Sequence, residues 1–110
     1  MSKREPGILV DDISTALGKI ERYTAGLDEA AFLEDDKTID AVVRNLEIIG
    51  EAAKQLSPDF KAQHSAIPWS QIAGLRNRIV HDYAGVDIKL VWHILKTSIP
   101  DLAVKLARTE

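Results

Sequence analysis

The sequence predicts an all-α fold, an up-and-down bundle of four to five helices that forms a single domain over residues 1–110. Apolar residues recur at intervals of three and four along the chain, whereas β-branched residues never alternate over the length of a strand. A chain of 110 residues fits one domain of ordinary size. It contains no cysteine, which excludes disulfides, thiolate zinc sites and a cysteine nucleophile.

The N-terminal half predicts two long helices. The first is an amphipathic helix of about 18 residues, because an apolar stripe from Leu9 to Tyr23 is interleaved with charges, and Gly26 suits the position just after its end. Asp28 can cap a short turn that follows. The second helix begins near Asp36, whose carboxylate can cap it, and ends at Ser57-Pro58.

Small residues interrupt the second predicted helix in mid-course, at Gly50, Ala52 and Ala53. We expect another helix, or a second copy of the chain, to approach the backbone closely there.

The C-terminal half predicts a third helix that Ile67-Pro68-Trp69 opens and that runs to Tyr83, before Ala84-Gly85. Asp87 is expected to cap a fourth helix. Pro100 either kinks that helix or starts a fifth one.

Polar side chains concentrate at the end of the third predicted helix, which carries Arg76, Asn77, Arg78, His81, Asp82 and Tyr83. On a continuous helix, Asn77 and His81 would lie one turn apart on the same face. Arg76 and His81 would lie roughly 140° apart, at about 100° per residue. A symmetric dimer in which each Arg76 serves the other chain's His81 would bring the two groups together.

An imidazole and a guanidinium at one point suit phosphodiester chemistry in RNA. Neutral His81 could take a proton from a 2′-hydroxyl and return one to the leaving oxygen, while Arg76 binds the phosphate. This chemistry requires no metal and no cofactor, and no set of metal ligands is visible in the sequence. The same residues also fit a surface ion pair with a histidine that stabilises a helix C-terminus.

The segment Arg76–Tyr83 matches an R-x4-H-x-Y motif and resembles the HepT-like toxins of the HEPN superfamily, formerly domain of unknown function 86. Three further segments resemble the same family in the same order. They are residues 44–53, residues 67–75, and Gly85-Val86-Asp87 followed by Val91-Trp92.

The resemblance implies a homodimer in which the motif helices meet in a cleft. It implies a metal-independent endoribonuclease toxin whose antitoxin is a nucleotidyltransferase that adenylylates the motif tyrosine. By position, Arg76 would contact the scissile phosphate, His81 would act as acid and base, and Tyr83 would be modified. Asn77 would support the site, and Asp82 departs from the glycine of many relatives. On a continuous helix, Arg78 would point away from Arg76 and His81. We expect Arg78 either to contact the RNA backbone or a partner, or to be a solvated charge.

The net charge of −3 is unevenly distributed. Residues 1–40 hold 10 acidic and 5 basic groups, whereas residues 41–110 hold 7 acidic and 9 basic groups, so the motif-bearing part is mildly basic. We expect a cytoplasmic protein with an RNA substrate (tRNA or mRNA) and with neither a membrane nor a DNA partner.

Two alternatives belong to other functional classes. The first is a non-catalytic dimeric module that binds the nucleotidyltransferase or a nucleotide. The second is a purely structural helical dimer.

Overall fold

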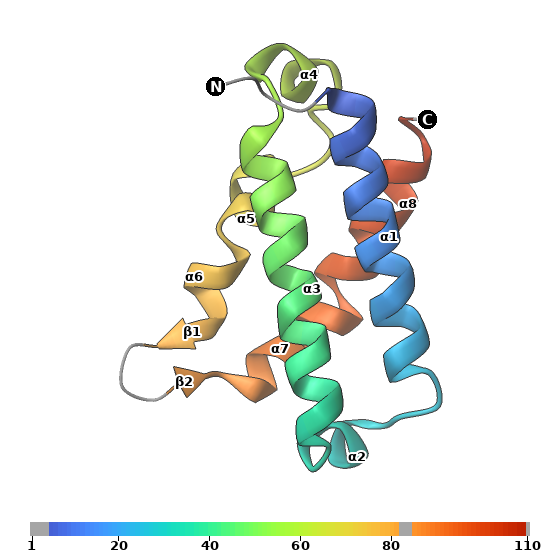
Figure 1. Cartoon of the computed structure of the whole chain (residues 1–110), viewed down its shortest axis with the longest axis vertical. Coiled ribbons are helices and arrows are strands. Elements are labelled where there is room, and N and C mark those ends of the chain that lie inside the picture. The colour runs from blue at the N-terminus through green and yellow to red at the C-terminus, as the bar shows by residue number, and fades with distance from the viewer. Residues whose placement is uncertain (1–4, 82–84, 110) are drawn as a thin grey trace.

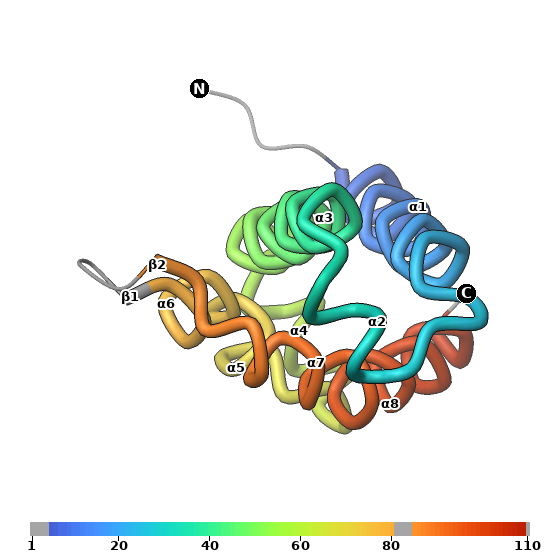
Figure 2. Tube along the Cα trace, turned by 90° about the horizontal axis from the view of Figure 1, so that it is seen from below, coloured from blue at the N-terminus to red at the C-terminus, as the bar shows by residue number. Residues whose placement is uncertain are grey.

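Two layers of helices enclose the core of the protein (Figure 1) (Figure 2). The computed structural model describes residues 5–81 and 85–109. One layer consists of α1 (Pro6–Thr24) and α3 (Asp36–Gln55), and the other of α5 (Trp69–Ala73), α6 (Leu75–Ile79), α7 (Ile88–Lys96) and α8 (Ser98–Ala107). The short α2 (Glu29–Leu33) lies between the layers at one end, and α4 (Pro58–Gln63) links them at the other.

The first layer is built as the apolar periodicity predicts. Ile13 of α1 and Leu46 of α3 are fully buried, since α1 lies along α3 and each helix turns its apolar stripe inward. Gly26 follows the end of α1 with a φ of 77°, a left-handed conformation that glycine adopts without strain. The expected position of Gly26 after the first helix is therefore confirmed.

Side-chain caps set the starts of α2, α3 and α4. Asp28 accepts the Ala31 N–H at 2.8 Å, and the Ser57 hydroxyl accepts the Phe60 N–H at 3.1 Å. The cap of α3 is Asp35 and not Asp36, because the Asp35 carboxylate accepts both the Thr38 N–H at 3.0 Å and the Thr38 hydroxyl at 2.7 Å. These two hydrogen bonds stabilise the ionised carboxylate and hold the pKa of Asp35 below its ordinary value.

The small residues of α3 face α5 of the same chain. A Cβ atom built on the buried Gly50 would lie 3.4 Å from the carbonyl oxygens of both Ile72 and Ala73. Ala53, one turn further on, is also fully buried. The expected close approach therefore takes place within one chain, and no second copy is needed to explain these small residues.

The third predicted helix, up to Tyr83, is wrong as a continuous element. The chain forms α5, turns at Gly74, forms α6 and leaves helical geometry at Val80, which has a φ of −102° and a ψ of 123°. Val80–His81 (β1) then pairs antiparallel with Gly85–Val86 (β2). Gly74 costs helical stability, and the β-branched pair Ile79-Val80 suits extended backbone.

The C-terminal segment forms the fifth helix that Pro100 allowed. The fourth helix, α7, ends at Lys96, and Thr97 interrupts the helical backbone with a φ of −122° and a ψ of −72°. Pro100 then lies in the first turn of α8, where its missing N–H has no intrahelical acceptor to lose. The all-α class is confirmed, although the described residues make eight helical segments and one short hairpin in place of four or five helices. No helix among these residues is long and apolar enough to cross a membrane.

We predict that Gly50→Leu lowers the free energy of unfolding by about 1–3 kcal/mol, because the larger side chain must push α5 away from α3. Urea denaturation measures the change. The matched control is Gly18→Leu on α1, where an added Cβ meets only the end of the Arg22 side chain, at 3.7 Å. This control should be neutral or stabilising, since leucine is the better helix former. Equal losses for the two variants would contradict the close approach of α5.

Candidate functional site

Three residues of the polar cluster, Arg76, Asn77 and Arg78, lie on α6, at the edge of the fold next to β1 and β2 (Figure 1). Leu75 and Ile79 are fully buried and anchor this single turn of helix to the core. The three residues between them, Arg76, Asn77 and Arg78, are all exposed. The turn therefore presents two guanidinium groups and one amide to solvent.

The hairpin places His81 beyond the end of α6. Val80 donates its N–H to the Arg76 carbonyl and pairs with Val86 across the two strands, and His81 pairs with Gly85. Gly85, the first residue of β2, has a φ of 75°, a left-handed conformation that favours glycine. The His81 side chain and the whole of Asp82 and Tyr83 lie outside the described residues.

Asp87 connects the hairpin to the next helix. Its N–H donates to the Ile79 carbonyl at 2.7 Å, and its carboxylate accepts the Leu90 N–H at 3.1 Å as the predicted cap of α7. One residue thus binds the end of α6 and the start of α7 together. The sequence indicated the cap but gave no sign of the second contact.

The geometry expected from a continuous helix is wrong for His81. Arg76 and Asn77 lie on α6, whereas His81 lies on β1, so neither the shared face of Asn77 and His81 nor the 140° separation from Arg76 applies. The structure brings Arg76, Asn77 and Arg78 together on one exposed turn and places His81 on the adjoining strand. Gly74 and the Ile79-Val80 pair are the sequence signals that could have indicated this break.

Arg78 faces a different part of the surface from the hairpin. It lines a small hollow of about 90 Å³ between α5 and α8, together with Gln71 and Asp101. Its side chain is exposed, so Arg78 is available to solvent or to a binding partner.

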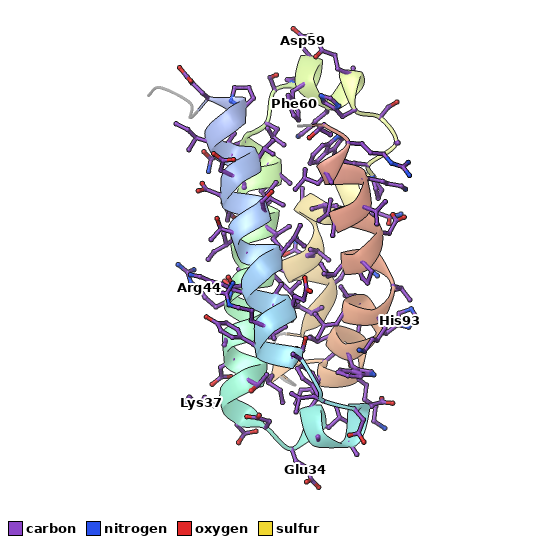
Figure 3. The ribbon with its side chains drawn as sticks, turned by 90° about the vertical axis from the view of Figure 1, so that its right-hand side faces the viewer. Glu34, Lys37, Arg44, Asp59, Phe60 and His93 are labelled. Atoms are coloured by element: carbon purple, nitrogen blue, oxygen red, sulfur yellow. The ribbon has the colours of Figure 1, made fainter. Side chains whose placement is uncertain are left out.

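Other charged and aromatic side chains of the described residues contact neighbours within the fold or face solvent. Lys54 pairs with Glu51 at 3.4 Å, and the Trp69 indole N–H donates to the His64 carbonyl at 3.0 Å. The His64 ring lies against Phe60 in a tilted arrangement, with ring centres 4.5 Å apart, and His93 projects from α7 into solvent (Figure 3). Within the ranges 5–81 and 85–109, no three histidine, aspartate or glutamate side chains group as metal ligands would.

Asn45 is a buried polar residue that the sequence did not single out. It is 5% exposed, and its amide donates to the Ala41 carbonyl one turn earlier, at 2.8 Å. An asparagine inside the apolar stripe of α3 was the available signal. The hydrogen bond accounts for its burial.

Comparison with known proteins identifies the family. The chain matches the Ribonuclease HepT-like family over residues 13–109. It belongs to the HepT-like ribonuclease family. The matched region contains α6, the hairpin and the whole R-x4-H-x-Y segment.

Similar proteins carry consistent names. A Thermococcus cleftensis protein named "Probable ribonuclease HepT" is 42% identical over 106 residues, 96% of each chain. A Methanocaldococcus jannaschii protein named "Putative RNase MJ1380" is 35% identical over 93% of this chain and 94% of its own. "Putative RNase TTE0752" of Caldanaerobacter subterraneus is 42% identical over 76% of this chain and 73% of its own. No solved structure matches the HepT-like chain significantly.

We predict that Asp87→Ala lowers the free energy of unfolding by about 1 kcal/mol, because α7 loses its side-chain cap. Chemical denaturation measures this loss, and hydrogen exchange at the Leu90 amide reports the cap itself. Asp87→Asn is the matched variant, since its amide oxygen can still accept the Leu90 N–H and should retain most of the stability. Equal destabilisation by both substitutions would show that capping is not the main role of Asp87.

Proposed function

We propose that this HepT-like chain is a metal-independent endoribonuclease that cleaves single-stranded or looped RNA, in tRNA or mRNA. The observation that carries the proposal is the R-x4-H pair in a chain of this family, with Arg76 exposed on α6 and His81 on the adjoining strand. The names of two relatives, "Probable ribonuclease HepT" and "Putative RNase MJ1380", support the same reaction class.

In the proposed reaction, neutral His81 removes the proton from a ribose 2′-hydroxyl. The resulting alkoxide attacks the adjacent phosphorus, and the bond to the 5′-oxygen breaks. The imidazolium returns the proton to that leaving oxygen, so the products are a 2′,3′-cyclic phosphate and a 5′-hydroxyl. Arg76 donates two hydrogen bonds to the non-bridging oxygens as negative charge accumulates on them, and Asn77 supports the site from the same turn.

The proposed active unit is a homodimer in which the α6 turns and hairpins of two copies meet. Two features support this arrangement. Arg76 and Asn77 are exposed on α6, and β1 and β2 lie beside α6 at one edge of the two layers (Figure 2). A second copy could then supply the Arg76 that serves each His81.

The proposed biological role is that of a toxin whose antitoxin is a nucleotidyltransferase. Transfer of an adenylyl group to the Tyr83 hydroxyl, two residues after His81, would add bulk and negative charge beside the acid–base residue. Both effects would exclude an RNA phosphate from the cleft.

We predict that His81→Ala reduces RNA cleavage by about 10²–10⁴-fold, through loss of the acid–base group. Arg76→Ala should reduce cleavage by about 10²–10³-fold, through loss of charge stabilisation. Gel analysis of labelled RNA in the presence of a chelator measures both. The control Arg22→Ala removes an exposed arginine from α1 and should cleave at the parent rate. Parent-level cleavage by the first two variants would overturn the site. Intact RNA with the unmodified parent would favour the non-catalytic binding module.

We predict that co-expression with a cognate nucleotidyltransferase adds the mass of one or more AMP units to the chain and suppresses cleavage. Intact-mass spectrometry detects the addition. The chain has two tyrosines, so Tyr83→Phe should abolish the added mass while Tyr23→Phe, on exposed α1 surface, retains it. Modification that survives Tyr83→Phe would exclude this tyrosine as the acceptor.

A further inference from the structure

A groove lies between α1 and α8, on the side of the fold opposite the hairpin (Figure 1). Its volume is about 590 Å³. Leu17 and Ile20 of α1 and Ile99 and Leu106 of α8 supply apolar lining. Small residues widen it on both walls, with Gly18 on α1 and alanines on α8. The groove is thus a mainly apolar surface, with Glu21 and Lys96 also in its lining, that the described residues leave unfilled.

The wall formed by α8 continues outward as an exposed apolar stripe. Pro100, Ala103, Val104 and Ala107 are all exposed, at the i, i+3, i+4 and i+7 spacing of one helix face. The Val104 side chain is 55% exposed, the largest value among the exposed large apolar side chains of the described residues. Helices of a soluble domain normally turn such a stripe toward the core. On α8 the buried stripe consists of other residues, Ile99, Leu102 and Leu106, so this second stripe is free to bind a partner.

Charges flank this stripe in a self-complementary order. Asp101 lies near the start of α8 and bonds Lys105 at 3.0 Å, while Arg108 lies at the end of the helix. If two α8 helices lie antiparallel about a two-fold axis, Asp101 of each copy comes beside Arg108 of the other. The alanines at 103 and 107 would let the two backbones approach closely at the centre of the contact.

We propose that this α8 surface (Pro100, Ala103, Val104 and Ala107, with the adjoining groove) binds α8 of a second copy of the chain in an antiparallel pair. Val104 of each copy lies at the mouth of the groove of the other. The hairpin and the groove lie on opposite sides of the fold, so this contact is separate from the dimer proposed for ribonuclease action, although Arg78 of α6 and Asp101 of α8 line one small hollow. The two contacts together would link copies into assemblies larger than a dimer.

The test is the mass of the full-length protein, measured by light scattering during gel filtration over a series of concentrations. We expect Val104→Glu to reduce the mass of the parent by at least half at the same concentration, because two carboxylates would be buried at the centre of the pair. Ile8→Glu is the matched control: it replaces another exposed apolar side chain, 43% exposed, outside the groove and the stripe. Its mass should equal that of the parent.

A charge exchange tests the register of the pair without altering its apolar centre. Asp101→Arg alone should weaken association at least several-fold, since it places two arginines together. The double variant Asp101→Arg with Arg108→Asp should restore it. Circular dichroism melts of all variants establish that each is folded.

Two results would overturn the proposal. One is an equal mass for the parent and Val104→Glu, whether both are monomeric or associated, which would leave the groove to another protein or to a lipid. The other is weakened association in both charge variants alike. The outcome is independent of ribonuclease activity, since Arg76→Ala and His81→Ala should retain the dependence of mass on Val104.

Discussion

The burial of α3 between two neighbours is the constraint on which the rest of the structure depends. One face of this helix packs along α1, and another meets α5 at the distance that Gly50 allows. A Cβ atom at Gly50 would touch the carbonyl oxygens of Ile72 and Ala73, at 3.4 Å. The close packing of α5 on α3 therefore requires a small residue at position 50. The place of the residues that follow α5 depends in turn on where α5 packs.

The packing of α5 on α3 also positions the candidate site, because α6 follows α5 directly in the chain. After α5 the chain turns at Gly74, and α6 is anchored by Leu75 and Ile79 in the core. Leu75 and Ile79 occupy the buried face of this single turn. The three residues between them, Arg76, Asn77 and Arg78, therefore face solvent. Asp87 then fixes the far end of the hairpin through the Ile79 carbonyl and the cap of α7. Rigid packing behind the site thus coexists with an accessible surface in front of it.

Two separate surfaces distinguish the two sides of the molecule. The α6 edge is polar and carries the motif, whereas the α1–α8 side is apolar with charges at its margin. Such a division suits the two proposed contacts between copies, one at the α6 edge for ribonuclease action and a second at the α1–α8 side. The mild positive balance of residues 41–110 belongs to the part that contains the motif, while the excess of acidic groups lies in residues 1–40.

The sequence predicted much of the fold because the relevant interactions are local. The helical class, the turn at Gly26 and the caps by Asp28 and Asp87 each depend on a few neighbouring residues. The cap of α3 was displaced by one residue, since Asp35 and Asp36 are chemically alike and only the backbone conformation selects between them. The motif residues were also recognisable without coordinates. Their mutual geometry was not, because it was derived from a helix that ends at Ile79.

The sequence by itself determined which side chains this protein can use: one arginine, one histidine and one tyrosine at motif spacing, on a helical domain without cysteine. Only the tertiary structure decided where the third predicted helix breaks. The periodicity of residues 67–83 is compatible with a continuous helix, and the local signals at Gly74 and Ile79-Val80 weaken such a helix without excluding it. The contact of α5 with Gly50 and the hydrogen bond from Asp87 to Ile79 come from residues distant in sequence or beyond the segment. These long-range contacts favour a broken helix and a hairpin over the continuous helix that local preference alone would allow.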